Sequence, residues 1–238
     1  MAIINNSFNF VFVHVPKAAG TSITTVLSKY TNYCDLEIGG TDFGERIQPI
    51  YRKRFGLGKH SPATEIRNLV GAVAWSRYFT FSFVRNPFSR CLSTYHFLRK
   101  WESPNAEFNA KMRAFESFEE FVMSDIWSQT NGPDEIFRPQ AYWLRAGMGS
   151  SALLVDYVGH VENIQWDMVE IFKIIGLTKA THGLDTIPVT NRSNNYGSQE
   201  FGSSRVVERI LEKYNGDFDL FNYSKDPRDH HIHKPDEG

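Results

Sequence analysis

The chain has 238 residues, of which 41% are hydrophobic and 14% aromatic, and its 26 basic and 27 acidic side chains leave a formal net charge of −1. Such a chain is long enough for one sizeable core, and its balanced charge argues against a broad nucleic-acid-binding surface. No apolar run reaches the roughly 18 residues of a membrane span, and two cysteines, Cys34 and Cys91, do not make a disulfide scaffold.

The first expected element is a buried strand over residues 8–15, because this run is almost wholly apolar and rich in β-branched and aromatic side chains. Pro16 ends the strand. A helix is expected over residues 22–30, with Thr21 or Ser22 as its N-cap.

The turn between this strand and helix has the features of an anion site. Backbone N–H groups and the helix dipole attract negative charge, Gly20 lets the backbone approach a ligand closely, and Lys17 adds a mobile positive charge. It is not a Walker A loop, because the lysine precedes the single glycine. An ordinary strand–helix turn with a solvated lysine is the alternative.

Residues 32–59 are expected to be rich in loops. A helix then runs from about Ser61-Pro62 to Gly71, and a second buried strand covers residues 79–84.

The second strand leads into a helix that ends near Lys100, with Asn86 as N-cap and Pro87 at the first helical position. Arg85 stands at the strand end, and Ser93 lies a little over two helical turns further on. An arginine fork and a hydroxyl group suit a phosphate monoester. The alternative is that Arg85 forms a structural ion pair and that Ser93 bonds to its own helix.

The remaining chain is expected to add a helical stretch, one strand and two long helices, over residues 103–140, 153–158, 163–175 and 203–214. Strands separated by helices imply an α/β fold of three layers with a central parallel sheet. We expect a single domain over residues 1–238, with a poorly ordered polar tail from about residue 226.

Two segments resemble the cofactor signatures of the sulfotransferase superfamily. P-K-A-A-G-T-S at residues 16–22 is similar to its 5′-phosphosulfate loop, and R-N-P-F-S-R-C-L-S at residues 85–93 is similar to its 3′-phosphate motif. The wording V-R-N-P-x-x-R-x-x-S is closest to the carbohydrate branch, the heparan 2-O-type enzymes and their bacterial relatives. Residues 157–163 and 208–223 extend the resemblance over nearly the whole chain.

The resemblance implies a P-loop NTPase-like fold and a sulfotransferase that uses 3′-phosphoadenylyl sulfate, releases adenosine 3′,5′-bisphosphate and needs no metal. The implied acceptor is a hydroxyl group, most simply on a carbohydrate or glycoconjugate. The implied cofactor-binding residues are Lys17, Ala19, Gly20, Thr21, Ser22, Arg85, Ser93 and Arg192. Arg90 is expected either to touch the ligand or to hold its helix against the sheet.

The acceptor must lose a proton, and His60 is the first candidate for the base, since relatives carry a histidine in a similar K-H-x-x place. Lys17 is the second catalytic candidate, at the leaving oxygen. His14 and Glu65 are the alternative bases, and Gln140 is a candidate for the acceptor cleft, together with Trp143.

Two other functions remain open. A nucleotide-phosphate-binding module without catalysis would keep Lys17 and Arg85 but lack a base. A P-loop kinase is disfavoured by the missing Walker A pattern, although Asp156 follows an apolar run. The histidines of residues 230–233 are taken as part of a tail rather than a metal site. Because no signal peptide or membrane anchor is recognised, we expect a cytoplasmic protein.

Overall fold

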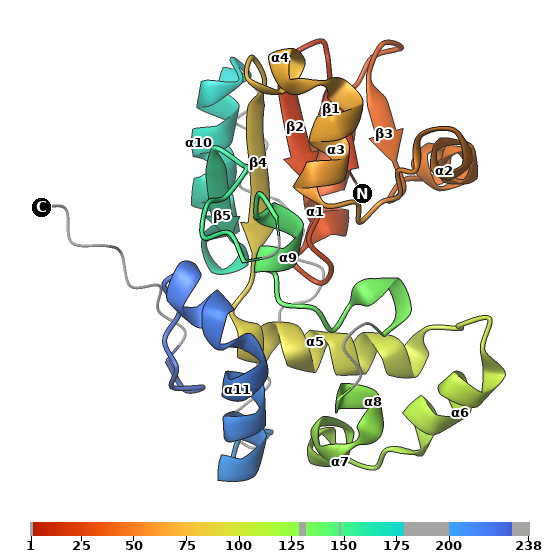
Figure 1. Cartoon of the computed structure of the whole chain (residues 1–238), viewed down its shortest axis with the longest axis vertical. Helices are drawn as coiled ribbons and strands as arrows, with labels where there is room; N and C mark the ends of the chain where they lie inside the picture. The colour runs from red at the N-terminus through yellow and green to blue at the C-terminus, as the bar shows by residue number, and fades with distance from the viewer. Residues whose placement is uncertain (1, 129–131, 148, 179–199, 230–238) are drawn as a thin grey trace, which may run out of the picture. The chain divides into compact units, whose positions relative to one another are not determined.

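The computed structural model describes residues 2–128, 132–147, 149–178 and 200–229 (Figure 1). The chain divides into two compact units that interleave along the sequence. The first unit contains residues 1–84 and 140–191, and the second contains residues 85–139 and 192–238. The expectation of a single domain stays a prediction.

The first unit is built on a five-stranded sheet with the order β3-β1-β2-β4-β5. The strands are β1 (Ala2–Asn5), β2 (Phe10–Val13), β3 (Leu36–Ile38), β4 (Phe79–Val84) and β5 (Tyr157–His160). Strand β4 pairs in parallel with β2 and with β5, whereas β1 is antiparallel to β2 and to β3. The expected α/β class is therefore confirmed, with a sheet that is parallel in its centre and antiparallel at one side.

The first predicted strand, over residues 8–15, is confirmed as the shorter β2, and the sequence missed β1 before it. Asn5 accepts a hydrogen bond from Phe8 N (2.7 Å) through its side chain, and Asn9 adopts the left-handed conformation with φ 54°. The chain therefore folds back between the two strands, and β1 and β2 pair as a hairpin.

One face of the sheet packs on α1 (Gly20–Leu27) and α10 (Ile164–Ile174). Four phenylalanines form the sheet side of this core, namely Phe10, Phe12, Phe81 and Phe83. Side chains that point to the other face, such as Val11 and Val13, are also fully buried. Burial on both faces explains the continuous apolar runs of β2 and β4.

Six further helical elements of the described residues complete the first unit. They are η1 (Ser28–Tyr30), α2 (Asp42–Phe55), α3 (Ala63–Val70), α4 (Ala72–Trp75), α9 (Ala141–Leu144) and η3 (Val161–Asn163). The helix expected between Ser61 and Gly71 is confirmed as α3, with Gly71 at its end. The loop expected over residues 32–59 is wrong in part, because it contains β3 and the 14-residue helix α2.

The third predicted strand is displaced along the sequence. Leu153 forms only an isolated bridge with Arg145, and β5 begins four residues later, at Tyr157. Position 159 of β5 requires a glycine, because a β-carbon there would come within 2.6 Å of the Phe83 ring on the neighbouring strand. The strand thus lies mostly beyond the apolar run that predicted it.

The second unit is helical. It consists of α5 (Pro87–Lys100), α6 (Ala106–Ala114), α7 (Phe118–Met123), α8 (Asp125–Ser128), η2 (Pro133–Glu135) and α11 (Ser204–Leu220). The predicted helix from Pro87 to Lys100 and the helical stretch after it are confirmed. Helix α11 extends beyond the predicted end, with non-helical backbone angles at Tyr214, where the prediction stopped.

Candidate functional site

The loop between β2 and α1 is held in an unusual backbone conformation. Lys17 (φ 64°) and Ala19 (φ 57°) both lie in the left-handed region, which costs a non-glycine residue about 1–2 kcal/mol. The loop is compact, and Ala18 N donates to Val15 O (3.3 Å). Backbone strain of this kind is typical of segments that are shaped for a ligand.

The start of α1 differs from the sequence prediction. The helix begins at Gly20 with Ala19 as its N-cap, and no side chain caps it. Thr21 and Ser22, which were expected as caps, belong to its first turn; Thr21 is exposed and Ser22 is buried. Ala19 has no polar side chain to cap the helix, and a helix N-terminus of this kind is suited to an anion.

Gly20 has a more specific role than the sequence suggested. A β-carbon at this position would lie 1.6 Å from His14 Nε2. The close approach that the glycine permits is thus to the His14 imidazole, and the expected approach to a ligand stays a prediction.

His14 connects this loop to His60. Their ring centroids are 4.5 Å apart, and His60 Nδ1 lies 3.4 Å from the backbone oxygen of His14. A carbonyl oxygen only accepts hydrogen bonds, so the contact assigns the proton to Nδ1 and the lone pair to Nε2. His60 therefore has the tautomer that a base acting through Nε2 requires.

Both imidazoles are held in the neutral form. Burial lowers the pKa of His60 well below 6.5, and the nearby charges of Lys59 and Lys17 lower it further. The pKa of His14 is lowered in the same way, first by burial. Lys17 thus acts electrostatically on both rings, and the structure brings together the two predicted catalytic residues, Lys17 and His60, within the first unit.

The backbone of His60 is fixed by Trp143. The indole Nε1 donates to His60 O (2.9 Å), and the Trp143 side chain is fully buried. Gln140 is buried as well. Both residues were candidates for the acceptor cleft, but neither exposes surface to an acceptor in this structure, and Trp143 instead fixes the backbone of His60.

A tight turn and helix α2 hold the segment just before His60. Gly58 N donates to Ser61 Oγ (3.0 Å), and Ser61 N donates to Gly58 O (3.1 Å). Gln48 on α2 accepts a hydrogen bond from Lys59 N (2.8 Å) through Oε1, and Glu45 Oε1 lies 3.5 Å from Lys59 Nζ. Burial alone would raise the pKa of Glu45, but the N–H group of Gly40 and the charge of Lys59 lower it.

The structure places Glu65, an alternative base, on α3. It is exposed there, which fits a solvated helix face.

Asp156 was considered for a Walker B role. It precedes β5 and accepts hydrogen bonds from Thr80 N and Oγ1 (both 2.8 Å) near the start of β4. Because β4 and β5 are parallel, this carboxylate is at the amino edge of the sheet, opposite to the edge where His14 and Lys17 follow β2. A Walker B role for Asp156 is therefore wrong.

In the second unit, α5 begins as the sequence predicted. Asn86 Oδ1 accepts from Phe88 N (3.0 Å) and Ser89 N (3.4 Å), and Pro87 occupies the first turn. Arg85 is buried and stands directly before this cap, and Ser93 is half-buried on the helix.

Arg90 has a structural role. Its guanidinium donates to Arg138 O (3.1 Å) and Ile136 O (2.9 Å) and lies 5.7 Å from the centre of the Tyr214 ring. These bonds tie α5 to residues 136–138 of the same unit, and the two expected roles of Arg90, against the sheet or at the ligand, stay predictions. Cys91 is buried beside it, and burial raises the pKa of its thiol.

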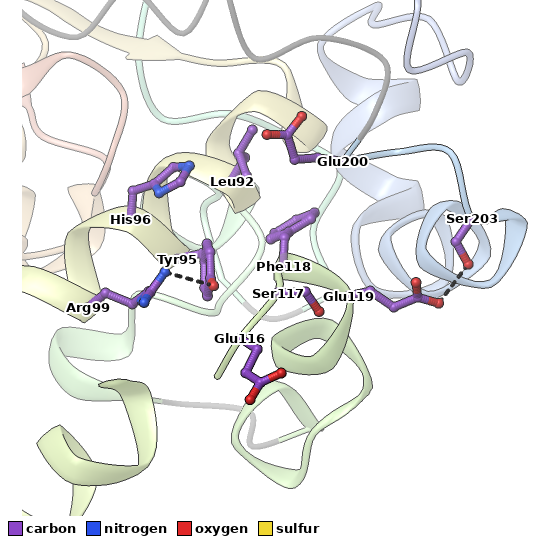
Figure 2. Close-up of a pocket in the computed structure, with 10 residues that line it drawn as sticks. All are labelled: Leu92, Tyr95, His96, Arg99, Glu116, Ser117, Phe118, Glu119, Glu200 and Ser203. Atoms are coloured by element: carbon purple, nitrogen blue, oxygen red, sulfur yellow. Dashed lines mark hydrogen bonds between the residues drawn. The ribbon is translucent and has the colours of Figure 1, made fainter. Parts of the chain in front are cut away.

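The second unit also contains a pocket of about 400 Å³ along α5. Figure 2 shows its lining, which consists of Leu92, Tyr95, His96, Arg99, Glu116, Ser117, Phe118, Glu119, Glu200 and Ser203. Arg99 Nη1 donates to Tyr95 OH (3.2 Å), and Glu119 Oε1 accepts from Ser203 Oγ (2.8 Å). Three carboxylates against one guanidinium disfavour an anion, so this pocket is not a candidate for a phosphate site.

Arg192 and the tail histidines at 230, 231 and 233 lie outside the described residues. Within the described ranges, no group of three or more His, Cys, Asp or Glu side chains is arranged to hold a metal ion. The same part of the chain contains no helix that is long and apolar enough to cross a membrane.

Comparison with known proteins identifies the family. Residues 1–224 match the model of the sulfotransferase family. A protein of Archaeoglobus fulgidus that is described only as uncharacterized is 31% identical over 136 residues, which are 57% of this chain and 96% of that protein. No solved structure matches the chain.

Proposed function

Because the chain belongs to the sulfotransferase family, we propose that it transfers a sulfuryl group from 3′-phosphoadenylyl sulfate to a hydroxyl group of a carbohydrate or glycoconjugate. Family membership establishes sulfotransfer in general, and the donor, the acceptor class and the residue roles are proposed. The observation that carries the residue roles is the contact between His60 and His14 beside the Lys17 loop.

The donor groups of the chain suit a ligand with two phosphates. In the first unit, the backbone amides of the first turn of α1, from Gly20 to Ser22, follow an N-cap residue, Ala19, that has no polar side chain, and Lys17 adds a positive charge. These groups would bind the 5′-phosphosulfate, with Ala19 setting the backbone turn. In the second unit, Arg85 and Ser93 would bind the 3′-phosphate, and Arg192 is proposed to clamp the same end of the nucleotide.

His60 would accept the proton of the acceptor hydroxyl. Its Nδ1–H is directed to the His14 carbonyl, so Nε2 presents the lone pair. A neutral imidazole is ready to accept a proton at neutral pH, and Trp143 and the Gly58–Ser61 turn keep it in place. The acceptor oxygen then forms its new bond to sulfur as its proton moves to Nε2.

Lys17 would neutralise the charge left behind. The donor supplies the sulfuryl group and a phosphate oxygen that leaves with the electron pair of the broken S–O bond. An ammonium group beside that oxygen stabilises the transition state more than the ground state. The left-handed backbone of Lys17 holds the residue in a fixed loop, which reduces the reorganisation needed at that moment.

The main alternative is a module that binds nucleotide phosphates without catalysis. It is separated from the enzyme by two measurements on the full chain, transfer of labelled sulfate to a panel of alcohols, phenols and oligosaccharides, and the shift of melting temperature with nucleotides. The proposal expects transfer to saccharides and a larger shift with adenosine 3′,5′-bisphosphate than with AMP. Equal shifts with both nucleotides would contradict the 3′-phosphate assignment, and binding without transfer would favour the module.

A further inference from the structure

Helix α2 is the most exposed long element of the first unit. Of its 14 residues only Gly44 is buried, where a β-carbon would lie 2.4 Å from Gly39 O. The helix is capped at its start by Thr41, whose side chain accepts from Gly44 N, and it ends at Gly56, whose φ is 71°. Figure 1 shows α2 beside β3, the strand at the antiparallel side of the sheet. The helix is thus firmly attached along one side and exposed along the other.

The exposed side carries an apolar stripe. Phe43, Ile47 and Ile50 follow one another at helical spacing, so they lie on one face. The Phe43 side chain is 60% exposed and the Ile50 side chain is 57% exposed. Apolar side chains of this size are rarely left in water together without a partner.

Basic residues border this α2 stripe. Arg46 and Lys53 are seven residues apart and form a parallel row, and Arg54 continues the line of Phe43 and Ile50 by one turn. All three side chains are exposed. Of the two acidic residues of α2, Glu45 is directed to Gly40 N and Lys59. The other, Asp42, is exposed at the start of the row of Arg46 and Lys53. The border of three basic residues and Asp42 keeps a net positive charge.

We propose that α2 docks on an anionic lipid surface, with the α2 stripe inserted among the acyl chains and the basic border on the headgroups. An interfacial helix needs a narrow apolar face, cationic side chains beside it and low overall hydrophobicity, and α2 has all three. Phe43 and Ile50 are both more than half exposed, so they are available to insert into a deformable surface.

Charge and composition favour this occupant over two others. A second copy of the chain, paired through antiparallel α2 helices about a two-fold axis, would bring the two basic borders together, which like-charge repulsion opposes. A soluble polyanion would bind the basic border but would gain nothing from Phe43 and Ile50. Only an anionic surface with an apolar interior uses both sets of side chains.

The test is flotation of the full chain with vesicles of phosphatidylcholine alone and of phosphatidylcholine with phosphatidylglycerol. We expect binding only to the anionic vesicles, and weaker binding at high salt. Arg46→Glu with Lys53→Glu should lower the partition coefficient by at least about fivefold for each charge. Phe43→Ser with Ile50→Ser should also abolish most binding, because the apolar contribution is lost.

Matched controls come from the same unit. Trp166 on α10 is 77% exposed, so Trp166→Ser removes an exposed apolar side chain elsewhere. Lys29→Glu with Arg77→Glu changes the net charge by the same amount as the α2 charge variant. Vesicle binding that the control variants reduce as much as the α2 variants would overturn the proposal. No binding by the wild type at low salt, or a wild-type dimer that Phe43→Ser with Ile50→Ser converts to monomer, would overturn it as well.

Discussion

The catalytic proposal rests on four residues of the first unit. His14 contacts His60 and leaves room only for glycine at Gly20, and the charge of Lys17 acts on both imidazoles. The sequence supplied Lys17 and His60 through the wording of two motifs. The sequence did not show that His14 contacts His60, because these two residues are 46 positions apart in the chain. No periodicity or spacing rule predicts such a contact.

Lys17→Ala should lower turnover by roughly 10²–10³, the usual cost of removing one electrostatic donor, while binding of adenosine 3′,5′-bisphosphate changes much less. Single-turnover kinetics and calorimetric titration separate the two effects. Lys29→Ala removes an exposed lysine just after α1 and is the control. Normal turnover with weakened nucleotide binding would make Lys17 a phosphate anchor only.

His60→Asn should abolish most transfer, by roughly 10²–10⁴, because an amide N–H can replace the Nδ1–H bond to His14 but cannot accept the proton. Nucleotide binding should stay intact. In the wild type, the acidic limb of kcat/KM should lie below pH 6.5, since burial and then the charges of Lys59 and Lys17 lower the pKa of His60. Lys59→Gln removes one of those charges and should move the limb to higher pH. Near-normal transfer by His60→Asn would redirect the search to Glu65.

Gly20→Ala should destabilise the chain and impair transfer, because the new methyl group would overlap the His14 imidazole. The double variant His14→Ala with Gly20→Ala should be more stable than the sum of the two single changes predicts, since the three nearest atoms to the new β-carbon are then gone. Urea unfolding of all four proteins forms the cycle, and Gly147→Ala, with nothing within 4 Å of its β-carbon, is the control. Additive effects would mean that the two residues do not share this space.

At the scale of whole elements, strong local signals were the reliable ones. Helix α5 was predicted from Asn86, Pro87 and the apolar pattern, and it begins and ends where expected. Helix α2 was missed although it has Thr41 as N-cap, acidic residues in its first turn and basic residues in its last. Pro49 within the helix and the glycines before it predict a loop. The contacts of Glu45 and Gln48 with Lys59 stabilise the helix despite these residues.

Substitution with lysine should distinguish the roles of Arg85 and Arg90, the two arginines near the start of α5. Arg90→Lys should lower thermal stability by about 1–3 kcal/mol, because a lysine cannot donate to both Ile136 O and Arg138 O from one planar fork, and nucleotide affinity should stay unchanged. Arg85→Lys should instead lower the nucleotide affinity and leave the thermal stability unchanged. The two variants are compared by thermal unfolding and by titration with adenosine 3′,5′-bisphosphate, and a stability loss without an affinity loss for Arg85→Lys would favour its structural role.

For the whole molecule, the α/β class and the three-strand parallel centre followed from the buried runs at β2 and β4. The antiparallel β1 and β3 did not, because short strands of three or four residues carry little pattern. The division into two interleaved units was also beyond the sequence, since it depends on which distant segments contact each other.

The buried histidines should make stability depend on pH. Since burial lowers the pKa values of His14 and His60, the unfolded chain binds protons below pH 6.5 that the folded chain does not, so stability is complete above pH 6.5 and falls as the pH drops. Each histidine contributes a slope of up to about 1.4 kcal/mol per pH unit in that range. Urea unfolding between pH 5 and 8 measures the slope. His60→Asn should lower the slope by the share of one histidine, up to about 1.4 kcal/mol per pH unit. An unchanged slope would mean that His60 is not buried in its neutral form.

The parallel pairing of β4 with β5 has a consequence for synthesis on the ribosome. Strand β4 ends at Val84, and its partner at the sheet edge starts only at Tyr157, after the whole stretch of residues 85–156 has been made. At about 5–20 residues per second, the apolar edge of β4 waits for several seconds with its backbone groups unpaired. An uncovered edge strand of this kind invites pairing with other nascent chains. While residues 85–156 are translated, the growing chain should therefore gain most from a chaperone that covers the edge of β4.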